Sequence, residues 1–147
     1  MVTKTTRYAL RILGYLVDHP DKRVQGQEIA AATGIPSDYL SKILSRLRKR
    51  GYVDGRKGWG GGFLLCDNAF SAPLAEVLEV FKGTMAVDRR CIFELRDCDA
   101  GNPCPLHKHW ERVRDEYDGM LSKLSVRDLK SRTAGSCSSN PKDSYIL

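Results

Sequence analysis

Four side chains of the types that bind soft metals lie within 17 residues of one another in the second half of this 147-residue chain. Cys91, Cys98, Cys104 and His107 follow the spacing C-x6-C-x5-C-x2-H. Thiolates combined with one imidazole suit an iron–sulfur cluster or a zinc ion. The intervening residues are polar, which argues against inert burial of all three cysteines. We therefore predict a metal-binding segment with these four residues as ligands, and an iron–sulfur cluster as the favoured group.

Zinc and thiol chemistry are the alternatives to a cluster. Structural zinc sites favour a pair of cysteines two to four residues apart, and this segment has none. A thiol–disulfide sensor remains open because it needs no fourth ligand. The odd total of five cysteines, without an export signal, argues against a disulfide framework. We expect Cys66 to serve packing and Cys137 to have no ordered role.

A catalytic Cys104–His107 pair is the alternative from another class of protein. Nucleophilic catalysis also needs an orienting acid and donors for an oxyanion, and no motif in the sequence indicates either. We therefore expect that the protein is not an enzyme.

Positive charge is concentrated in the first half of the chain. Residues 1–65 hold 12 Lys and Arg against 5 Asp and Glu, whereas residues 66–147 hold 12 against 13. Seven cations lie between residues 42 and 57, and Asp54 is the one acid among them. Such a local surplus predicts a polyanionic partner such as double-stranded DNA.

The elements that carry these cations follow the order of a winged helix-turn-helix domain. Apolar periodicity predicts helices that open near Thr5, near Gln25 and near Ser37, the third ending by Arg50. The period then changes, and residues 52–53 and 62–65 read as two short strands around a glycine-rich loop. The predicted fold is mainly α with a small β-hairpin wing.

Exposed cations on one helix often do no more than keep it solvated. Here the turn between two helices, the basic helix and the basic wing coincide, which favours DNA binding. The third helix would enter a major groove, and the wing would reach the adjacent backbone or minor groove. The predicted DNA-binding residues are Ser37, Tyr39, Ser41, Lys42, Arg46 and Arg48 on the helix, with Arg56 and Lys57 on the wing.

The second half of the chain predicts a long helix that needs a partner. A further helix opens around Ser71–Pro73, and residues 84–105 show no periodicity. From Leu106, apolar residues alternate in steps of four and three over about 27 Å, the pattern of a coiled-coil seam. A second copy of the chain is the simplest partner. The predicted seam comprises Leu106, Trp110, Val113, Tyr117, Met120 or Leu121, and Leu124.

The predicted organisation has four parts. They are a winged helix-turn-helix domain at 1–82, a cysteine-containing sensor loop at 83–105, a dimerisation helix with a short terminal helix at 106–132, and a flexible tail at 133–147. No apolar run is long enough to span a bilayer, and the N-terminus lacks the features of a signal peptide. We expect a soluble, cytoplasmic protein without a membrane partner.

Three stretches of the sequence resemble the Rrf-type family of winged-helix transcriptional regulators, the superfamily of IscR, NsrR and CymR. They are YLSKIL at 39–44, GGGFLL at 60–65 and CPLH at 104–107, and the resemblance extends over nearly the whole chain. It is closest to the members that sense iron–sulfur status. The resemblance implies a homodimeric regulator, most often a repressor, whose long helices are exchanged between protomers on a near-palindromic operator.

The resemblance also implies a cofactor. In the iron–sulfur-sensing members, three cysteines and a histidine hold a [2Fe–2S] cluster, and the matching positions are Cys91, Cys98, Cys104 and His107. Arg7 stands where nitric-oxide-sensing members can use a carboxylate ligand, which disfavours their mode of ligation. The resemblance to the iron–sulfur-sensing members favours [2Fe–2S] over [4Fe–4S]. The signal would be iron–sulfur, redox or nitric oxide status. A cluster-free member controlled by thiol oxidation or by a protein partner is the alternative.

Overall fold

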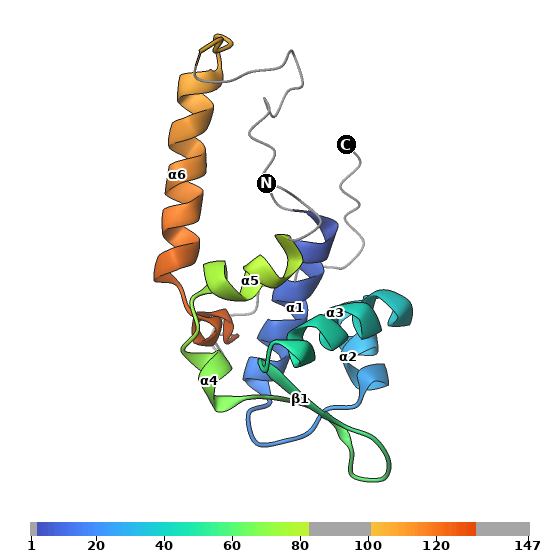
Figure 1. Cartoon of the computed structure of the whole chain (residues 1–147). Coiled ribbons are helices and arrows are strands. Elements are labelled where there is room, and N and C mark those ends of the chain that lie inside the picture. The colour runs from blue at the N-terminus through green and yellow to red at the C-terminus, as the bar shows by residue number, and fades with distance from the viewer. Residues whose placement is uncertain (1–2, 83–100, 132–147) are drawn as a thin grey trace.

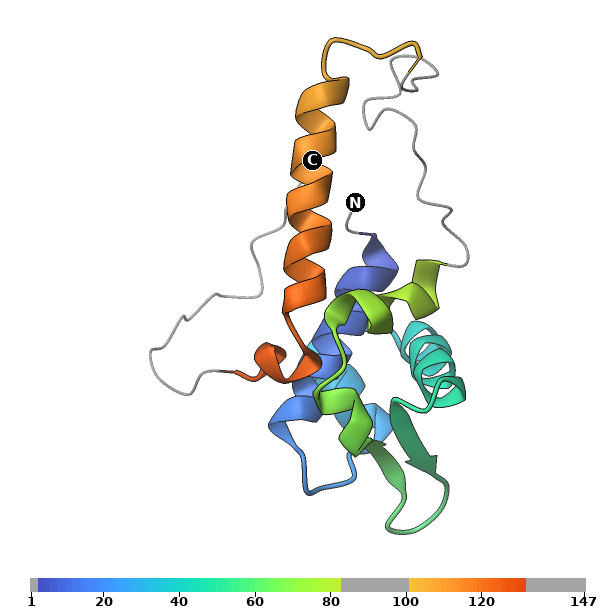
Figure 2. The ribbon, with the colours of Figure 1, turned by 60° about the vertical axis from the view of Figure 1, so that its left-hand side comes forward.

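The fold is a small helical body with a β-hairpin at one end and a long helix that projects from the other (Figures 1 and 2). The structure is a computed structural model that describes residues 3–82 and 101–131. The elements are α1 (Lys4–Asp18), α2 (Gly26–Thr33), α3 (Ser37–Lys49), β1 (Val53–Arg56), β2 (Gly62–Leu65), α4 (Asp67–Phe70), α5 (Leu74–Lys82), α6 (His107–Lys123) and the 3₁₀ helix η1 (Val126–Leu129).

Helices α1, α2 and α3 pack around one core because each presents an apolar stripe at helical spacing. Thr3 caps α1 by accepting a hydrogen bond from the Thr6 amide at 3.1 Å. Gly34 closes α2 in the left-handed conformation, at φ 67°. That sharp turn brings α3 across α2 and buries Ile35 between the helices. The buried residues of α3 are Leu40, Ile43, Leu44 and Leu47.

The hairpin pairs β1 and β2 antiparallel, with Val53 opposite Leu65 and Arg56 opposite Gly62. Strand β1 is longer than the predicted pair 52–53, because Asp54, Gly55 and Arg56 all join the ladder. Gly55 lies directly opposite Phe63, and a Cβ there would lie 3.1 Å from the Phe63 ring, a close contact that a larger residue could make only if the ring shifted. The sequence pattern did not predict this extension of β1, since glycine and aspartate are poor strand formers.

The second half of the described chain folds back onto the first. Leu74 at the start of α5 donates a backbone hydrogen bond to Leu124 at the end of α6, at 2.8 Å. Val126 donates to Ala72 at 3.0 Å, and its side chain is fully buried. Helix η1 then packs against α1, where the Ser131 amide reaches the Asp18 carboxylate at 2.9 Å. The base of α6 is therefore fixed to the helical body.

The predicted fold class is confirmed: the chain is mostly helical with a two-stranded antiparallel hairpin. The short helix α4 was not predicted, and the last short helix is a 3₁₀ helix. The predicted tail and residues 83–100 of the predicted sensor loop lie outside the described residues. Within the described part of the chain, no helix combines the length and the apolar character needed to cross a membrane.

Candidate nucleic-acid interface and metal-ligand segment

Helix α3 presents its predicted contact residues to solvent. Its buried stripe faces the core, so the opposite face carries Ser37, Tyr39, Ser41, Lys42, Arg46 and Arg48, all of them exposed. Arg56 and Lys57 on the hairpin are exposed as well. Within the described residues, Lys42, Arg46 and Lys57 form no ion pair with an acid. These cations are therefore available to an external polyanion.

An aromatic pair joins the start of α3 to α1. The rings of Tyr8 and Tyr39 meet edge to face, with centroids 5.8 Å apart. The Lys4 ammonium lies 5.5 Å from the Tyr39 ring and 5.7 Å from the Tyr8 ring. Lys4 thereby extends the positive surface of α3 onto a second helix. This position of Lys4 could not be predicted from the sequence, because the contact joins residues that lie far apart in the chain.

An ionic network fixes the base of the hairpin. The Arg23 guanidinium donates a hydrogen bond to the Asp54 carboxylate and lies 3.4 Å from the Gly62 carbonyl. Arg56 lies 3.6 Å from the same carboxylate. The hydrogen bond from Arg23 lowers the pKa of Asp54, so this acid stays charged and orders two cations beside it. Asp54, the one acid among the seven cations, thus positions the wing.

Backbone contacts hold the wing against the α1–α2 connection. Val24 and Phe63 exchange backbone hydrogen bonds of 2.9 and 2.8 Å, and the side-chain Nε2 of Gln25 donates to the Gly61 carbonyl at 2.8 Å. Gly62 has φ 122°, and a Cβ there would lie 2.7 Å from the Val24 carbonyl oxygen. The pairing of Val24 with Phe63 beside β2 therefore requires glycine at position 62.

Two of the four predicted metal ligands lie in the described residues, at the start of α6. Cys104 is buried, and its carbonyl accepts a hydrogen bond from the His107 amide at 3.0 Å. The His107 Nε2 atom lies 3.2 Å from a Glu111 carboxylate oxygen, one turn along the helix. A carboxylate on the second ring nitrogen is the usual support of a ligand histidine. Glu111 was not predicted, although the spacing His-x3-Glu places the two side chains one helical turn apart.

The other two predicted ligands, Cys91 and Cys98, lie outside the described residues, as does Cys137. Among residues 3–82 and 101–131, no group of three or more His, Cys, Asp or Glu side chains is arranged to hold a metal ion. The described donors, one thiol and one imidazole, have the chemistry that an iron–sulfur cluster requires. Cys66 is half-buried, and burial raises the pKa of its thiol, which disfavours the reactive thiolate.

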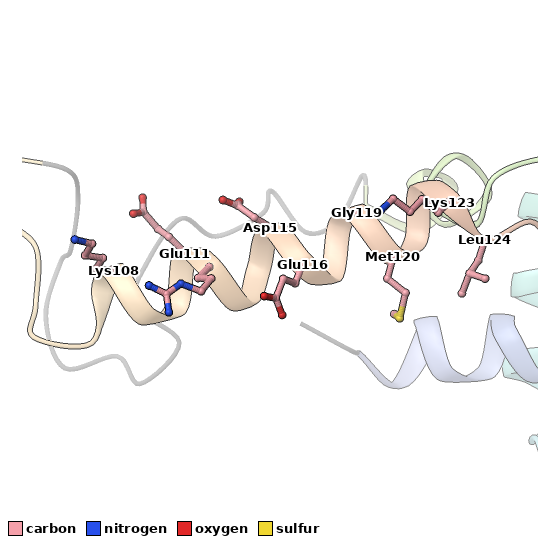
Figure 3. Close-up of a pocket in the computed structure, with 9 residues that line it drawn as sticks. Lys108, Glu111, Asp115, Glu116, Gly119, Met120, Lys123 and Leu124 are labelled. Carbon is pink, nitrogen blue, oxygen red and sulfur yellow. The ribbon is translucent and has the colours of Figure 1, made fainter.

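Helix α6 has an inner and an outer apolar face. Leu121 is buried and Tyr117 packs against the core, whereas Leu106, Val113, Met120 and Leu124 are exposed. Of the two alternatives in the predicted seam, Met120 is exposed and Leu121 is buried, and the predicted seam residue Tyr117 packs against the core of its own chain. A shallow and open hollow on this helix is lined by residues 108–124 alone, so no second element of the described chain covers it. Figure 3 shows Met120 and Leu124 pointing to one side of the helix, and Glu111 and Asp115 pointing to the opposite side.

The three-helix body, the exposed basic helix and the braced hairpin define a winged-helix DNA-binding regulator. A family described as "Rrf2: Iron-dependent Transcriptional regulator" matches residues 2–132. The chain belongs to this Rrf2 family of transcriptional regulators. It is also 33% identical over 129 residues to the transcriptional regulator IscR of Photorhabdus laumondii, a match that covers 87% of this chain and 77% of that protein.

Solved structures agree on the fold. IscR of T. potens superposes with a TM-score of 0.66 and 21% identity, covering 88% of this chain and 85% of that one. CymR, the global cysteine regulator of B. subtilis, gives a TM-score of 0.69 and 23% identity, covering 91% and 98%. The family and these relatives are transcriptional regulators rather than enzymes, as expected from the sequence. Because IscR and CymR share this fold, the fold alone carries no information on the controlling signal.

Proposed function

We propose that the protein is a homodimeric, cytoplasmic repressor whose binding to a near-palindromic operator is controlled by an iron–sulfur cluster. The observation that carries the DNA-binding half is the exposed cationic surface formed by α3 and the braced wing. Each protomer would place α3 in a major groove, one helical turn (about 34 Å) from its partner's. The contacts would come from Ser37, Tyr39, Ser41, Lys42, Arg46 and Arg48 on α3, and from Arg56 and Lys57 on the wing.

Selection of duplexes from a randomised pool, followed by binding titrations at several salt concentrations, tests this half of the proposal. Arg46→Ala and Lys57→Ala should each weaken binding to all sequences and reduce the slope of log affinity against log salt by about 1, because each removes a phosphate contact. Lys130→Ala, which removes an exposed cation after η1, is the control and should keep the slope. An unchanged slope in the Arg46 and Lys57 variants would contradict these contacts.

The cluster half of the proposal rests on the chemistry of the donor set. Cys104 and His107 lie next to each other at the start of α6, and Cys91 and Cys98 complete a set of three thiols and one imidazole. When bound, the cluster would supply a redox-active and chemically labile group. Glu111 would hold the His107 ring in one orientation. A [2Fe–2S] cluster is favoured over [4Fe–4S] because the matched members use these ligand types.

Control of DNA binding would pass through α5 and α6, which flank the cysteine segment. The two helices pack against each other, and the end of α6 is bonded to the start of α5. Gain, loss or oxidation of the cluster would change how residues 91–104 sit against the DNA-binding domain. The population of protein able to bind the operator would shift accordingly.

A second copy of the chain would cover the exposed side of α6. Members of the family commonly act as dimers. Leu106, Val113 and Met120 repeat at intervals of seven residues on that side, as in a coiled-coil seam.

Thiol control is the second candidate function. It is favoured by the presence of three thiols within the same 14 residues. Oxidation of a cysteine pair, or binding of a protein partner, would then replace the cluster as the signal.

A further inference from the structure

Trp59 is the most exposed large apolar side chain in the described residues, at the tip of the wing. Its relative exposure is 106%, so the indole makes no contact that shields it from water. Nothing in the DNA-binding proposal uses this residue, since that proposal depends on charged and short polar side chains.

The loop that presents Trp59 is rigidly anchored at its base. Gly58 and Gly60, on either side of the tryptophan, adopt φ values of 91° and 72° that other residues rarely adopt. The Gly61 amide donates a hydrogen bond to the Gly58 carbonyl at 3.0 Å, and the Gly61 carbonyl accepts the 2.8 Å bond from Gln25. These bonds order the backbone of the turn that carries the indole, which lowers the ordering cost of a contact made there.

The surroundings of Trp59 indicate what would cover it. Arg56 and Lys57 precede it on the same hairpin, and 71% of the Arg56 side chain is exposed. Arg48 of α3 lies against the hairpin at Gly55, so the wing and α3 share one positive surface. Figures 1 and 2 show the hairpin protruding beyond the helices beside it. A thin, cationic projection with an aromatic tip suits the narrow minor groove of DNA, with the cations directed to the phosphates.

We propose that Trp59 is an apolar DNA contact that enters the minor groove next to the major groove occupied by α3. This inference rests on the proposed DNA-binding function and adds a contact of a different physical kind. The indole would pack against sugars or between base edges, as apolar wedges do in other minor-groove proteins. Such a contact releases no counterions, so its contribution to affinity is independent of salt.

Trp59→Ala should therefore weaken binding to the selected duplex by at least about fivefold, because stacking on bases contributes this much or more. The loss should be equal at every salt concentration, which gives a log–log line parallel to the wild-type line. Lys57→Ala should instead flatten that line. Trp59→Phe should retain most of the affinity. Because the indole has no contacts in the free protein, the thermal unfolding of Trp59→Ala should match that of the wild type.

A direct measurement uses the fact that the chain has two tryptophans. Trp110→Phe leaves Trp59 as the sole tryptophan, and acrylamide should quench its emission strongly in the free protein. Saturating duplex should protect Trp59 from acrylamide. Full binding of the duplex with unchanged quenching, or an unchanged affinity in Trp59→Ala, would overturn this inference and leave DNA binding intact. Failure of the wild-type protein to bind any duplex would overturn both proposals.

Discussion

Tyr52 connects the DNA-binding elements to the helix that leads into the cysteine segment. It follows α3, and its hydroxyl donates a 2.7 Å hydrogen bond to the Glu76 carboxylate on α5. Burial, reinforced by that hydrogen bond, raises the pKa of Tyr52 from 10.0 to about 12. The phenol is thus held neutral where its ionisation would break the link between the two helices.

The raised pKa predicts a loss of stability at alkaline pH. Since the folded state holds the Tyr52 proton more tightly, its contribution is fully present below pH 10 and is lost as the pH rises toward 12. Tyr52→Phe should reduce the free energy of unfolding near neutral pH by about 1 kcal/mol, the value of one hydrogen bond. The variant should also lose less stability between these two pH values. Urea denaturation at both pH values checks this, and an equal loss in variant and wild type would contradict it.

The exposure of the predicted DNA-binding residues could be predicted from the sequence, but their contacts with other elements could not. The six predicted DNA-binding residues on α3 are exposed because helical periodicity fixes which face of α3 is buried, and Arg56 and Lys57 are exposed on the hairpin. The placement of Lys4 over Tyr39 and the ion pair of Arg23 with Asp54 depend on how separate elements pack. Neither periodicity nor composition contains that information.

At the scale of elements, the hairpin depends on two glycines for different reasons. Gly62→Ala should cost more than about 2 kcal/mol, because the backbone would be strained and the new Cβ would meet the Val24 carbonyl. Gly60→Ala is the matched control: φ is also positive, but a Cβ meets nothing within 4 Å. Its cost should be about 1 kcal/mol. Thermal unfolding of both variants tests the comparison, and equal costs would show that Val24 does not brace the wing.

The same hairpin shows where prediction of elements from the sequence succeeds and fails. Helices α1, α2, α3 and α5 begin close to the predicted residues, and α3 ends next to the predicted Arg50, because apolar spacing marks them. The strand predicted at residues 52–53 is shorter than β1, because Asp54 and Gly55 are residue types that favour turns. Their strand conformation comes from Arg23 and Phe63, which are distant in sequence.

At the scale of the whole molecule, α6 divides its apolar residues between its own chain and a proposed partner. Val113 is 47% exposed on the outer side, whereas Leu121 is buried against the body. Val113→Asp should convert a dimer into a folded monomer, since an acid would be placed in the seam of both helices. Ser122→Asp adds the same charge on another side of α6 and should leave the dimer intact. Light scattering after gel filtration distinguishes these outcomes, and a dimeric Val113→Asp protein would contradict the proposed seam.

The central proposal joins this architecture to a cluster held by Cys91, Cys98, Cys104 and His107. The most direct test is an anaerobic ultraviolet–visible spectrum of freshly purified protein, with iron and sulfide assays on the same sample. We predict structured visible absorbance with matching iron and sulfide, lost in Cys98→Ala and Cys104→Ala proteins that remain folded. A colourless protein that reconstitution fails to colour, or full colour in both variants, would contradict the account.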